Sequence, residues 1–538
     1  MKKNSQVFRF LTVIVTVLCM GAGSLIVSAE SSDAGMEQIN AQKLSFSSYT
    51  YNNWGVPVKC PDPYTIEKAV TGVTLGIGDF KKPNDLFADH KGNIYLAASG
   101  DTAADNRLIK FDSRLKVIKI WTGYTDSSGA VVPFKEPQGV FVTPEDSIYV
   151  ADGISKNIIE MDQQGKAIRI IAPPSKQDST IITDDFIERY RPSKLVVDST
   201  GRIHVVAISV NEGIVDFDPD GKFEGFLAAG KVNANPMEVL WKKISTQAQL
   251  DKMQDFVPIE YNNISLDNED FIFATAAAID EKIVRSEIHS GRGTENGALV
   301  RRLNMLGKDI LRRKGFGPPS GDYDIFDLDN NMDAAYKGIS HMVDVANGSE
   351  GTYTVLDDNR SRIFTYDSEG NLLYAFGGPD VTAGGFRTPN SIAQSGSYLY
   401  VLDSGTRTIT VFRRTEFGEN ISQAIMWQES GDYHKSAELW NMVLTQNANY
   451  DQAYSGLGKA AYRDGEYEKA MELFELGYNK DWYSRAYVEY RKKVVADWFA
   501  PAAVTVFIAV SILLTIVKVR KVITRKKMEA LEKGWIDL

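Results

Sequence analysis

A short motif recurs six times across residues 83–414, and it limits the possible fold of this chain more than any other feature. Each copy contains an apolar segment, a polar turn that usually includes glycine, and a second segment of alternating or β-branched residues. This pattern is typical of two antiparallel strands joined by a tight turn. The repetition therefore predicts a chain built from several similar small sheets. The copies begin at Pro83, Pro137, Pro192, Tyr261, His341 and Pro389.

Two further strands follow the motif in most copies. RLIKFD and LKVIKIWTG follow the first copy, and NIIEMDQQG and AIRIIA follow the second. Four strands in each of six units predict a six-bladed β-propeller, because small sheets packed around an axis leave only short edges unpaired.

The sixth copy lacks its fourth strand, because the chain becomes helical just after Glu416. Residues 65–72, however, resemble residues 117–123, which supply the fourth strand of the first copy. Residues 66–70 are therefore predicted to close the ring as the outer strand of the last blade, where they would cover an open edge.

The motif residues resemble those of NHL-repeat propellers. The resemblance rests on the Pro-x-x-aliphatic start of the copies, the G-x-I-Y-V core, and the acidic residue that ends the second strand at Asp152, Asp357 and Asp403. It implies a mainly β fold, with a six-bladed NHL-type propeller over residues 65–415. The spacing breaks around the fourth copy, where residues 231–257, 283–297 and 316–338 form irregular segments. Such insertions are either functional loops or tolerated surface variation.

Beyond Ile421 the apolar residues recur with helical spacing. Residues 429–450 and 463–482 align at an offset of 34, which pairs Gly431 with Gly465 and Tyr433 with Tyr467. The aligned segments resemble a pair of tetratricopeptide repeats, and the resemblance implies two helix hairpins. A helix at 484–495 is predicted to cap them and to continue toward the C-terminus. Such a module serves as a stalk, as a partner-binding groove, or as both.

An apolar run at residues 499–517 contains no charged side chain and is about 28 Å long as a helix, which predicts one transmembrane helix. Six Lys or Arg follow within residues 518–527. By the positive-inside rule they place the C-terminus in the cytoplasm and the preceding domains outside the cell.

The N-terminus indicates export as well. An apolar stretch at 10–20 follows the basic residues Lys2, Lys3 and Arg9. Small residues at 27–29 offer a cleavage site for signal peptidase. Only Cys60 remains in the mature chain, so no intrachain disulfide can form, which favours a bacterial envelope. The predicted organisation is a signal peptide at 1–29, an N-terminal extension at 30–64, the propeller at 65–415, the helical module at 420–496, the transmembrane helix at 499–517 and a basic cytoplasmic tail at 518–538.

Composition and motifs exclude several function classes. The net charge of -10 argues against nucleic-acid binding, because the positive footprint that phosphates require is missing. The sequence contains no nucleophile elbow, no Walker loop and no zinc-binding helix of the H-E-x-x-H type. Its five His occupy unlike positions in the repeats. The acidic segment DFDPDG at residues 216–221 is interpreted as a hairpin turn, because Leu227 stands where a calcium loop needs Glu.

Polar side chains mark the entry to the first strand of each copy, which in a propeller faces the axis or the mouth of its channel. Most of them are amides, which suit hydrogen bonding to hydroxyl-rich ligands such as sugars. The same amides could instead satisfy the ends of strands. The candidate ligand-binding ring consists of Asn84, Asp85, Gln138, Lys194, Asn262, Asn263, His341 and Asn390.

Two functions remain open. The favoured one is a membrane-anchored extracytoplasmic propeller without a cofactor, which binds a ligand or a protein partner through the propeller or the helical repeats. The arrangement looks like exported propeller proteins of Gram-positive bacteria, some of them associated with carbohydrate uptake or other membrane complexes. The alternative is a metal-dependent lactonase-type hydrolase. Six-bladed relatives of the gluconolactonase type hold a divalent metal with Glu, Asn and Asp, which Asp85, Asn263 and Asn390 imitate only in part, because no Glu stands at an equivalent position.

Overall fold

A computed structural model describes residues 44, 46–228, 260–277, 279–290, 293–294, 297–314, 319–322, 339–348, 350–382 and 384–536. The predicted signal peptide at 1–29, the insertion at 231–257 and most of the segment at 316–338 lie outside these residues.

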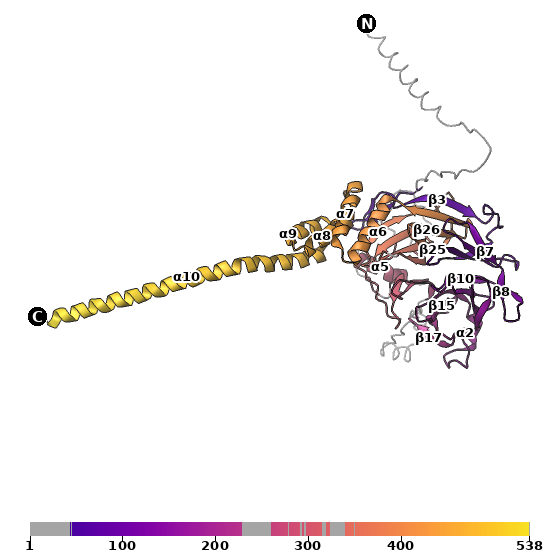
Figure 1. The fold of residues 1–538 in the computed structure, drawn as a ribbon, viewed down its shortest axis with the longest axis horizontal. Coiled ribbons are helices and arrows are strands. Elements are labelled where there is room, and N and C mark those ends of the chain that lie inside the picture. The colour runs from indigo at the N-terminus through magenta and orange to yellow at the C-terminus, as the bar shows by residue number, and fades with distance from the viewer. Residues whose placement is uncertain are drawn as a thin grey trace, which may run out of the picture. The chain divides into compact units, whose positions relative to one another are not determined.

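Six small antiparallel sheets form the blades of a propeller, as the repeats predict (Figure 1). Blade 1 contains β4 (Lys82–Ala88), β5 (Ile94–Ser99), β6 (Arg107–Phe111) and β7 (Val117–Trp121). Blade 2 contains β10 (Pro137–Val142), β11 (Ile148–Asp152), β12 (Asn157–Met161) and β13 (Ala167–Ile171). Blade 3 contains β14 (Pro192–Val197), β15 (Ile203–Ala207), β16 (Ile214–Phe217) and β17 (Phe223–Leu227). The hairpin of β8 (Gly123–Thr125) and β9 (Val131–Pro133) links blades 1 and 2, and the short helix α2 (Asp184–Arg189) precedes blade 3.

Blade 4 departs from the regular pattern. Its described strands are β18 (Tyr261–Leu266), β19 (Ile272–Ala276) and β20 (Val300–Leu303). The helix α5 (Glu281–Ser290) stands between the second and the third of these strands. The polar segment predicted as an irregular insertion at 283–297 therefore begins within a helix.

Blade 5 contains β21 (Met342–Asn347), β22 (Thr352–Asp357), β23 (Arg362–Asp367) and β24 (Leu372–Phe376). Two strands from the N-terminal extension, β1 (Tyr49–Tyr51) and β2 (Pro57–Lys59), add to the outer edge of this sheet, where Tyr49 pairs with Ala375. The extension is thus partly built into the propeller, which the sequence did not predict.

Blade 6 closes the ring. It contains β25 (Pro389–Ser395), β26 (Tyr398–Asp403), β27 (Thr408–Arg414) and the N-terminal strand β3 (Tyr64–Thr71). Ile409 pairs with Val70, and Phe412 pairs with Ile66. The predicted closing strand is confirmed, so the two ends of the propeller are held together by backbone hydrogen bonds.

The inner strand of every blade carries a bulge at its entry, where the register shifts by one residue. In blade 1 the shift lies between Pro83 and Asp85, and in blade 6 between Pro389 and Ser391. A bulge leaves one residue out of the ladder and changes the direction of the next side chain. These bulges decide which polar residues reach the axis.

Five helices follow the propeller: α6 (Glu416–Glu429), α7 (Tyr433–Gln446), α8 (Asp451–Arg463), α9 (Tyr467–Leu476) and α10 (Lys480–Ile536). The tight turns after α6 and α8 use Gly431 (φ 88°) and Gly465 (φ 77°), because a left-handed backbone costs glycine little. Helix α10 is continuous through the apolar run, so the predicted cap and the predicted membrane helix are one element.

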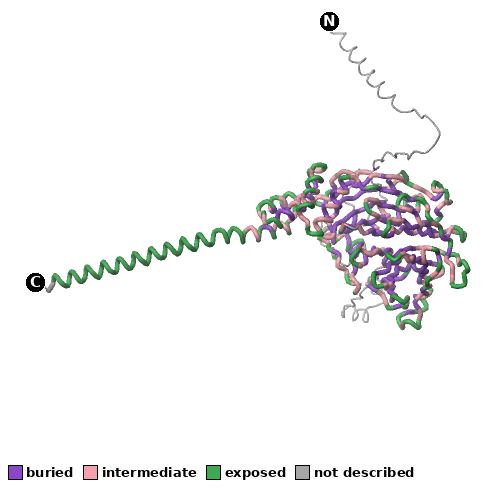
Figure 2. Tube along the Cα trace, viewed as in Figure 1, coloured by how far each residue is buried: buried purple, intermediate pink, exposed green. Residues whose placement is uncertain are grey.

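Helices α6, α7 and α8 pack against blades 5 and 6. Phe417, Ile421 and Trp440 share a buried cluster with Tyr64 and Phe376 of the propeller. In Figure 2 the blades have a buried interior, whereas the outer part of α10 is exposed along its whole length.

Candidate functional site

A cavity of about 260 Å³ lies on the axis of the propeller, and all six inner strands line it. We call it the axial cavity. Because successive side chains of a strand point to opposite faces, every second residue of an inner strand faces the axis. Its wall contains one such residue from each blade: Phe87, Phe141, Val196, Ser265, Ala346 and Ala393. The rings of Phe87 and Phe141 lie 4.9 Å apart, so part of the wall is aromatic.

Polar residues surround the axis at the entry end of the strands. They follow the bulge and stand two positions before the wall residues. Together with Gly139, which holds the same position in blade 2, they form what we call the axial ring: Asp85, Gly139, Lys194, Asn263, Asp344 and Ser391. Gly139 permits close packing of blades 2 and 3, because a Cβ there would lie 2.2 Å from the carbonyl oxygen of Ser193.

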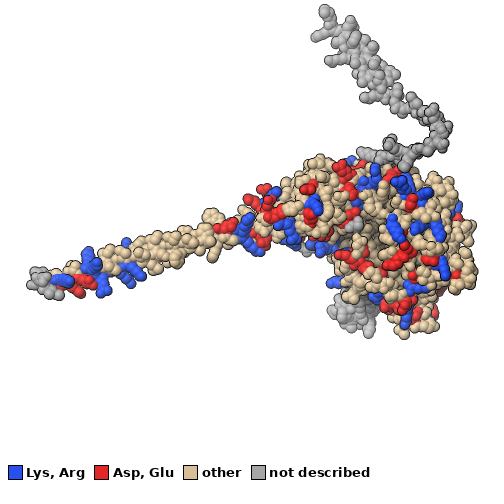
Figure 3. All heavy atoms as spheres, in the orientation of Figure 1, with Lys and Arg blue, Asp and Glu red and all other residues tan. Residues whose placement is uncertain are grey.

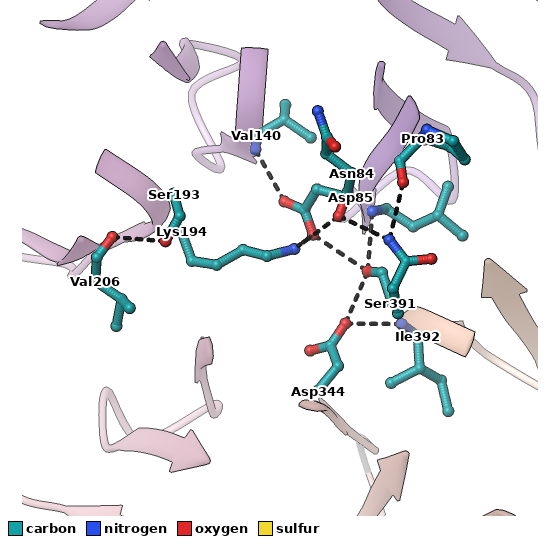
Figure 4. Close-up of polar contacts among 12 residues, drawn as sticks. Pro83, Asn84, Asp85, Val140, Ser193, Lys194, Val206, Asp344, Ser391 and Ile392 are labelled. Atoms are coloured by element: carbon teal, nitrogen blue, oxygen red, sulfur yellow. Dashed lines mark hydrogen bonds and ion pairs between the residues drawn. The ribbon is translucent and has the colours of Figure 1, made fainter. Parts of the chain in front are cut away.

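The charged members of the axial ring form one connected network (Figure 4). The ammonium of Lys194 pairs with Oδ1 of Asp85. The hydroxyl oxygen of Ser391 lies 3.1 Å from Asp85 Oδ1 and 2.7 Å from Asp344 Oδ2. Backbone amides complete the set, since Val140 donates to Asp85 at 3.0 Å and Ile392 donates to Asp344 at 2.7 Å.

The contacts of Ser391 favour one protonated carboxyl group in this network. Its oxygen accepts a hydrogen bond from the amide of Leu86 at 3.0 Å, and its single hydroxyl proton can serve only one of the two carboxyl groups. The other contact is a hydrogen bond only when that carboxyl is protonated. Burial, with Asp85 adding to it and Lys194 opposing it, raises the pKa of Asp344 to about 7. Asp344 therefore carries the proton below neutral pH, and the charges of Lys194 and Asp85 balance.

Asn263 leaves a donor for a ligand. Its side chain is 3% exposed, and its Nδ2 has no hydrogen-bond partner among the described residues. A buried donor without a partner costs free energy, which a bound acceptor would recover.

The predicted amide ring separates into two groups. Asp85, Lys194 and Asn263 meet at the axial cavity. The other amides connect neighbouring blades: the Nδ2 groups of Asn84, Asn262 and Asn390 donate to the carbonyl oxygens of Pro137, Met342 and Pro83 at 2.8, 2.8 and 2.9 Å, respectively.

The remaining predicted residues stand apart from the cavity lining. Gln138 is the half-buried bulge residue of blade 2. His341 precedes β21 and is half-buried, and its Nδ1 lies 2.6 Å from Oδ1 of Asp358. Its pKa is raised by the hydrogen bond with Asp358.

Asp344 and Ser391 were missed from the sequence, together with the aromatic wall. The fifth repeat is predicted to begin at His341, whereas its inner strand begins at Met342. The residues two positions after Pro83, Pro137, Pro192, Tyr261, Met342 and Pro389 give the complete axial ring, from Asp85 in blade 1 to Ser391 in blade 6. Asp344 required the correct register of the fifth copy, whereas Ser391 required recognition of the bulge in the sixth copy, whose start at Pro389 is predicted correctly.

The residues present do not fit the divalent metal of a lactonase-type site. Asp85 is already paired with the ammonium of Lys194, whose positive charge opposes a cation beside it. Asn390 donates its Nδ2 between blades 6 and 1 and does not line the axial cavity, so it stands apart from Asp85 and Asn263. Among the described residues, no group of three or more His, Cys, Asp or Glu is placed to hold a metal ion.

Comparisons with known proteins give the following result. No family model and no curated protein matches this chain. Among solved structures, it is similar to a virginiamycin B lyase from Staphylococcus aureus at 11% identity, with 65% of this chain and 99% of that chain covered and a TM-score of 0.36. It is also similar to a gluconolactonase-like protein solved by structural genomics, at 10% identity, 69% and 98% coverage and a TM-score of 0.36. A protein of unknown function from Bacteroides thetaiotaomicron matches at 10% identity, 62% and 70% coverage and a TM-score of 0.37. These matches carry no argument about activity.

Proposed function

We propose that the propeller is a ligand-binding module, and that its axial cavity takes a small, neutral, hydroxyl-rich molecule such as a sugar. The proposal rests on the buried side-chain Nδ2 of Asn263, which has no hydrogen-bond partner among the described residues. Asn263 lines the same cavity as Asp85, Lys194 and Asp344. An apolar wall with a few converging polar groups is the usual form of a small-molecule site.

The size and the charge of the cavity support this class of ligand. Its volume of about 260 Å³ lies just below the range of about 300–1,000 Å³ for sites that hold drug-sized molecules, so one sugar ring is a suitable occupant. Lys194 and Asp85 neutralise each other, and Asp344 is protonated below about pH 7. A neutral ligand avoids the cost of burying an unpaired charge there.

We further propose that α10 anchors this module in a bacterial cell membrane, with the propeller outside and the C-terminus in the cytoplasm. Among the described residues, α10 is the one helix long and apolar enough to span a bilayer. Figure 3 shows the stretch of α10 without charged side chains, followed by basic residues toward its end. Accessibility of a C-terminal epitope only after permeabilisation of cells tests this orientation.

In the sequence, the helical module lies between the propeller and the apolar part of α10. We propose that it offers a surface to another membrane protein, as an accessory to a carbohydrate-uptake or other membrane complex. Crosslinking in cells, followed by identification of the captured proteins, tests this part separately from ligand binding.

Calorimetric titration of the detergent-solubilised full chain with glucose, galactose, mannose and N-acetylglucosamine tests the ligand. Asn263→Ala should weaken binding up to about tenfold, because one hydrogen bond is lost, and should leave the fold intact, since the lost donor has no partner among the described residues. His341→Gln is the matched control, because His341 does not line the cavity.

Absence of binding across this panel would contradict the proposal. Hydrolysis of lactones that requires a divalent cation and is lost in Asp85→Ala would replace it with the hydrolase alternative.

A further inference from the structure

We infer that the ligand is a linear oligosaccharide, whose further units occupy a second cavity beside the axial one. This inference rests on the proposed function, since it assumes that the axial cavity holds the first sugar unit. The second cavity has a volume of about 430 Å³ and lies where blade 4, blade 5 and the end of α6 meet. We call it the junction cavity; its lining includes Phe273, Arg302, Leu311, Asn347, Tyr353 and Glu429.

Asn347 connects the two cavities, because its side chain lines both of them. Its Nδ2 donates to Ser265 Oγ and to the carbonyl oxygen of Leu266, both at 3.0 Å, which fixes the amide across blades 4 and 5. Its Oδ1 is buried and has no hydrogen-bond partner within the described part of the chain. A ligand that extends from one cavity to the other would pass this free acceptor.

Tyr353 provides a second unused polar group. Its side chain is 2% exposed, and its hydroxyl has no hydrogen-bond partner among the residues that the structure describes. Its ring lies 5.0 Å from that of Phe273, so an aromatic surface and a hydroxyl occur together in the junction cavity. Sugar units combine apolar ring faces with hydroxyl groups, and this lining offers a counterpart to both.

Two charged side chains of the junction cavity, Arg302 and Glu429, are bonded to other groups of the protein. The guanidinium of Arg302 lies 4.3 Å from the ring centroid of Phe271 and bonds to Asp267 at 2.7 Å and to Glu269 at 2.6 Å. Glu429 accepts a hydrogen bond from Ser368 at 2.8 Å. These contacts occupy Arg302 and Glu429 without the ligand, and the exposed Arg312 also lines the cavity.

The structural difference between blades explains why the second cavity lies here. In blades 1, 2 and 3 a fourth strand follows the third directly. In blade 4 the described residues that follow β20, up to residue 314, form an isolated bridge between Leu303 and Asp309, and residues 310–312 line the cavity. The irregular blade therefore opens a space that the regular blades fill.

The test compares the monosaccharide that binds best with its linear oligomers of increasing length, by calorimetric titration of the full chain. The oligomers should bind at least about tenfold more tightly, since several new contacts form. Tyr353→Phe should reduce oligomer affinity about two- to tenfold and leave monosaccharide affinity unchanged. It should not lower the thermal stability of the ligand-free protein, because the hydroxyl it removes is buried without a partner.

Tyr95→Phe is the matched control. Tyr95 lies in the second strand of blade 1, one register position away from the place of Tyr353 in blade 5; it is fully buried and lies outside both cavities. Equal affinities for monosaccharide and oligomers, or an oligomer affinity that is unchanged in Tyr353→Phe, would overturn this inference and leave the proposed function standing. Failure of every sugar to bind would overturn the proposed function itself.

Discussion

The outer strands of blades 2 and 5 hold the same position in the repeat but have different surroundings. In β13 of blade 2, Ile168 and Ile170 are 56% and 45% exposed. In β24 of blade 5, all five residues are buried. The hairpin of β1 and β2 pairs with β24, and the helical module packs over blades 5 and 6. The outer strand of the propeller is therefore covered in blade 5, next to the helical module, and exposed to solvent in blade 2.

Specific contacts attach the covering elements to blades 5 and 6. The hydroxyl of Tyr450 donates to the carbonyl oxygen of Leu373 at 2.7 Å. Arg414, at the end of β27, pairs with Glu350 at 3.4 Å and with Glu419 of α6 at 3.2 Å. The ring is thus fixed to the helices by buried polar contacts as well as by apolar packing.

Removal of a buried aromatic residue should affect the covered side most strongly. Trp440 is 1% exposed, and its ring stacks on Tyr450 at 6.3 Å. Trp440→Ala should lower the free energy of unfolding by about 3–5 kcal/mol, because it leaves a cavity in the cover. Denaturant titration in detergent measures the change. The same substitution at Trp54, which is 71% exposed, is the control, and equal losses in the two variants would contradict the described packing.

A smaller loss is expected from one hydrogen bond between the cover and the propeller. Tyr450→Phe leaves the buried carbonyl of Leu373 without this donor, which should cost about 1–3 kcal/mol. Tyr454→Phe is the matched variant, because its hydroxyl donates to Ala448 in an exposed position and its loss should change little. If the two variants lose the same free energy of unfolding, the contact with Leu373 does not hold the helical module on the propeller.

The two sides should also respond differently to pH. Burial raises the pKa of Asp344, in blade 5, to about 7 from about 3.9 in an unfolded chain. A raised carboxyl pKa contributes stability that is complete below the unfolded value and is lost as pH rises through the folded one. Unfolding temperature should therefore fall between about pH 4 and pH 7, and Asp344→Asn should remove this part of the slope.

His204 gives the corresponding titration in blade 3, and it acts at higher pH. Burial alone would lower its pKa, but hydrogen bonds with Asp198 and Asp216 raise it above the ordinary value. Its contribution is complete below about pH 6.5 and is lost as pH rises through the raised pKa. A decline above pH 6.5 that persists in Asp344→Asn and disappears in His204→Gln would separate the two. If Asp344→Asn alone or His204→Gln alone removed both pH-dependent declines in stability, the two titrations would not be independent.

The smallest change is expected on the bare blades. Ile118→Thr and Ile168→Thr should alter the free energy of unfolding by no more than about 0.5 kcal/mol, because both side chains are more than half exposed. Light scattering of the same variants checks whether these residues serve as a contact surface. A loss above about 1 kcal/mol would show that something covers blades 1 and 2.

Much of the architecture could be predicted from local sequence patterns. The alternating residues of AIRII indicate a half-exposed strand, and the positions of Gly431 and Gly465 indicate the two helix turns. Even the closing strand was predicted, because residues 65–72 resemble a fourth strand and no such strand follows β27. The hairpin over blade 5 was not predicted, since β1 and β2 are three residues each and too short to show a period.

The site was predictable only in part. Asp85, Lys194 and Asn263 were identified because they stand at the start of recognisable repeats. Asn84 and Asn390 were grouped with them, although the bulge turns their amides toward the next blade. A bulge changes which neighbouring residue faces the axis, and no residue in these segments indicates that a bulge is present. Asp344 was missed because the fifth copy has the same bulge and because its inner strand begins at Met342, one residue after the predicted start at His341.

The sequence by itself determined which segments become strands and helices and in what order they follow, because these properties depend on residues close together in the chain. The tertiary structure alone decided which polar groups meet. Asp85 and Ser391 are separated by 306 positions, and closure of the ring brings them to 3.1 Å. It likewise decided what covers β24 and where the junction cavity opens. These outcomes depend on the packing of distant blades around one axis, and that packing has no local signature.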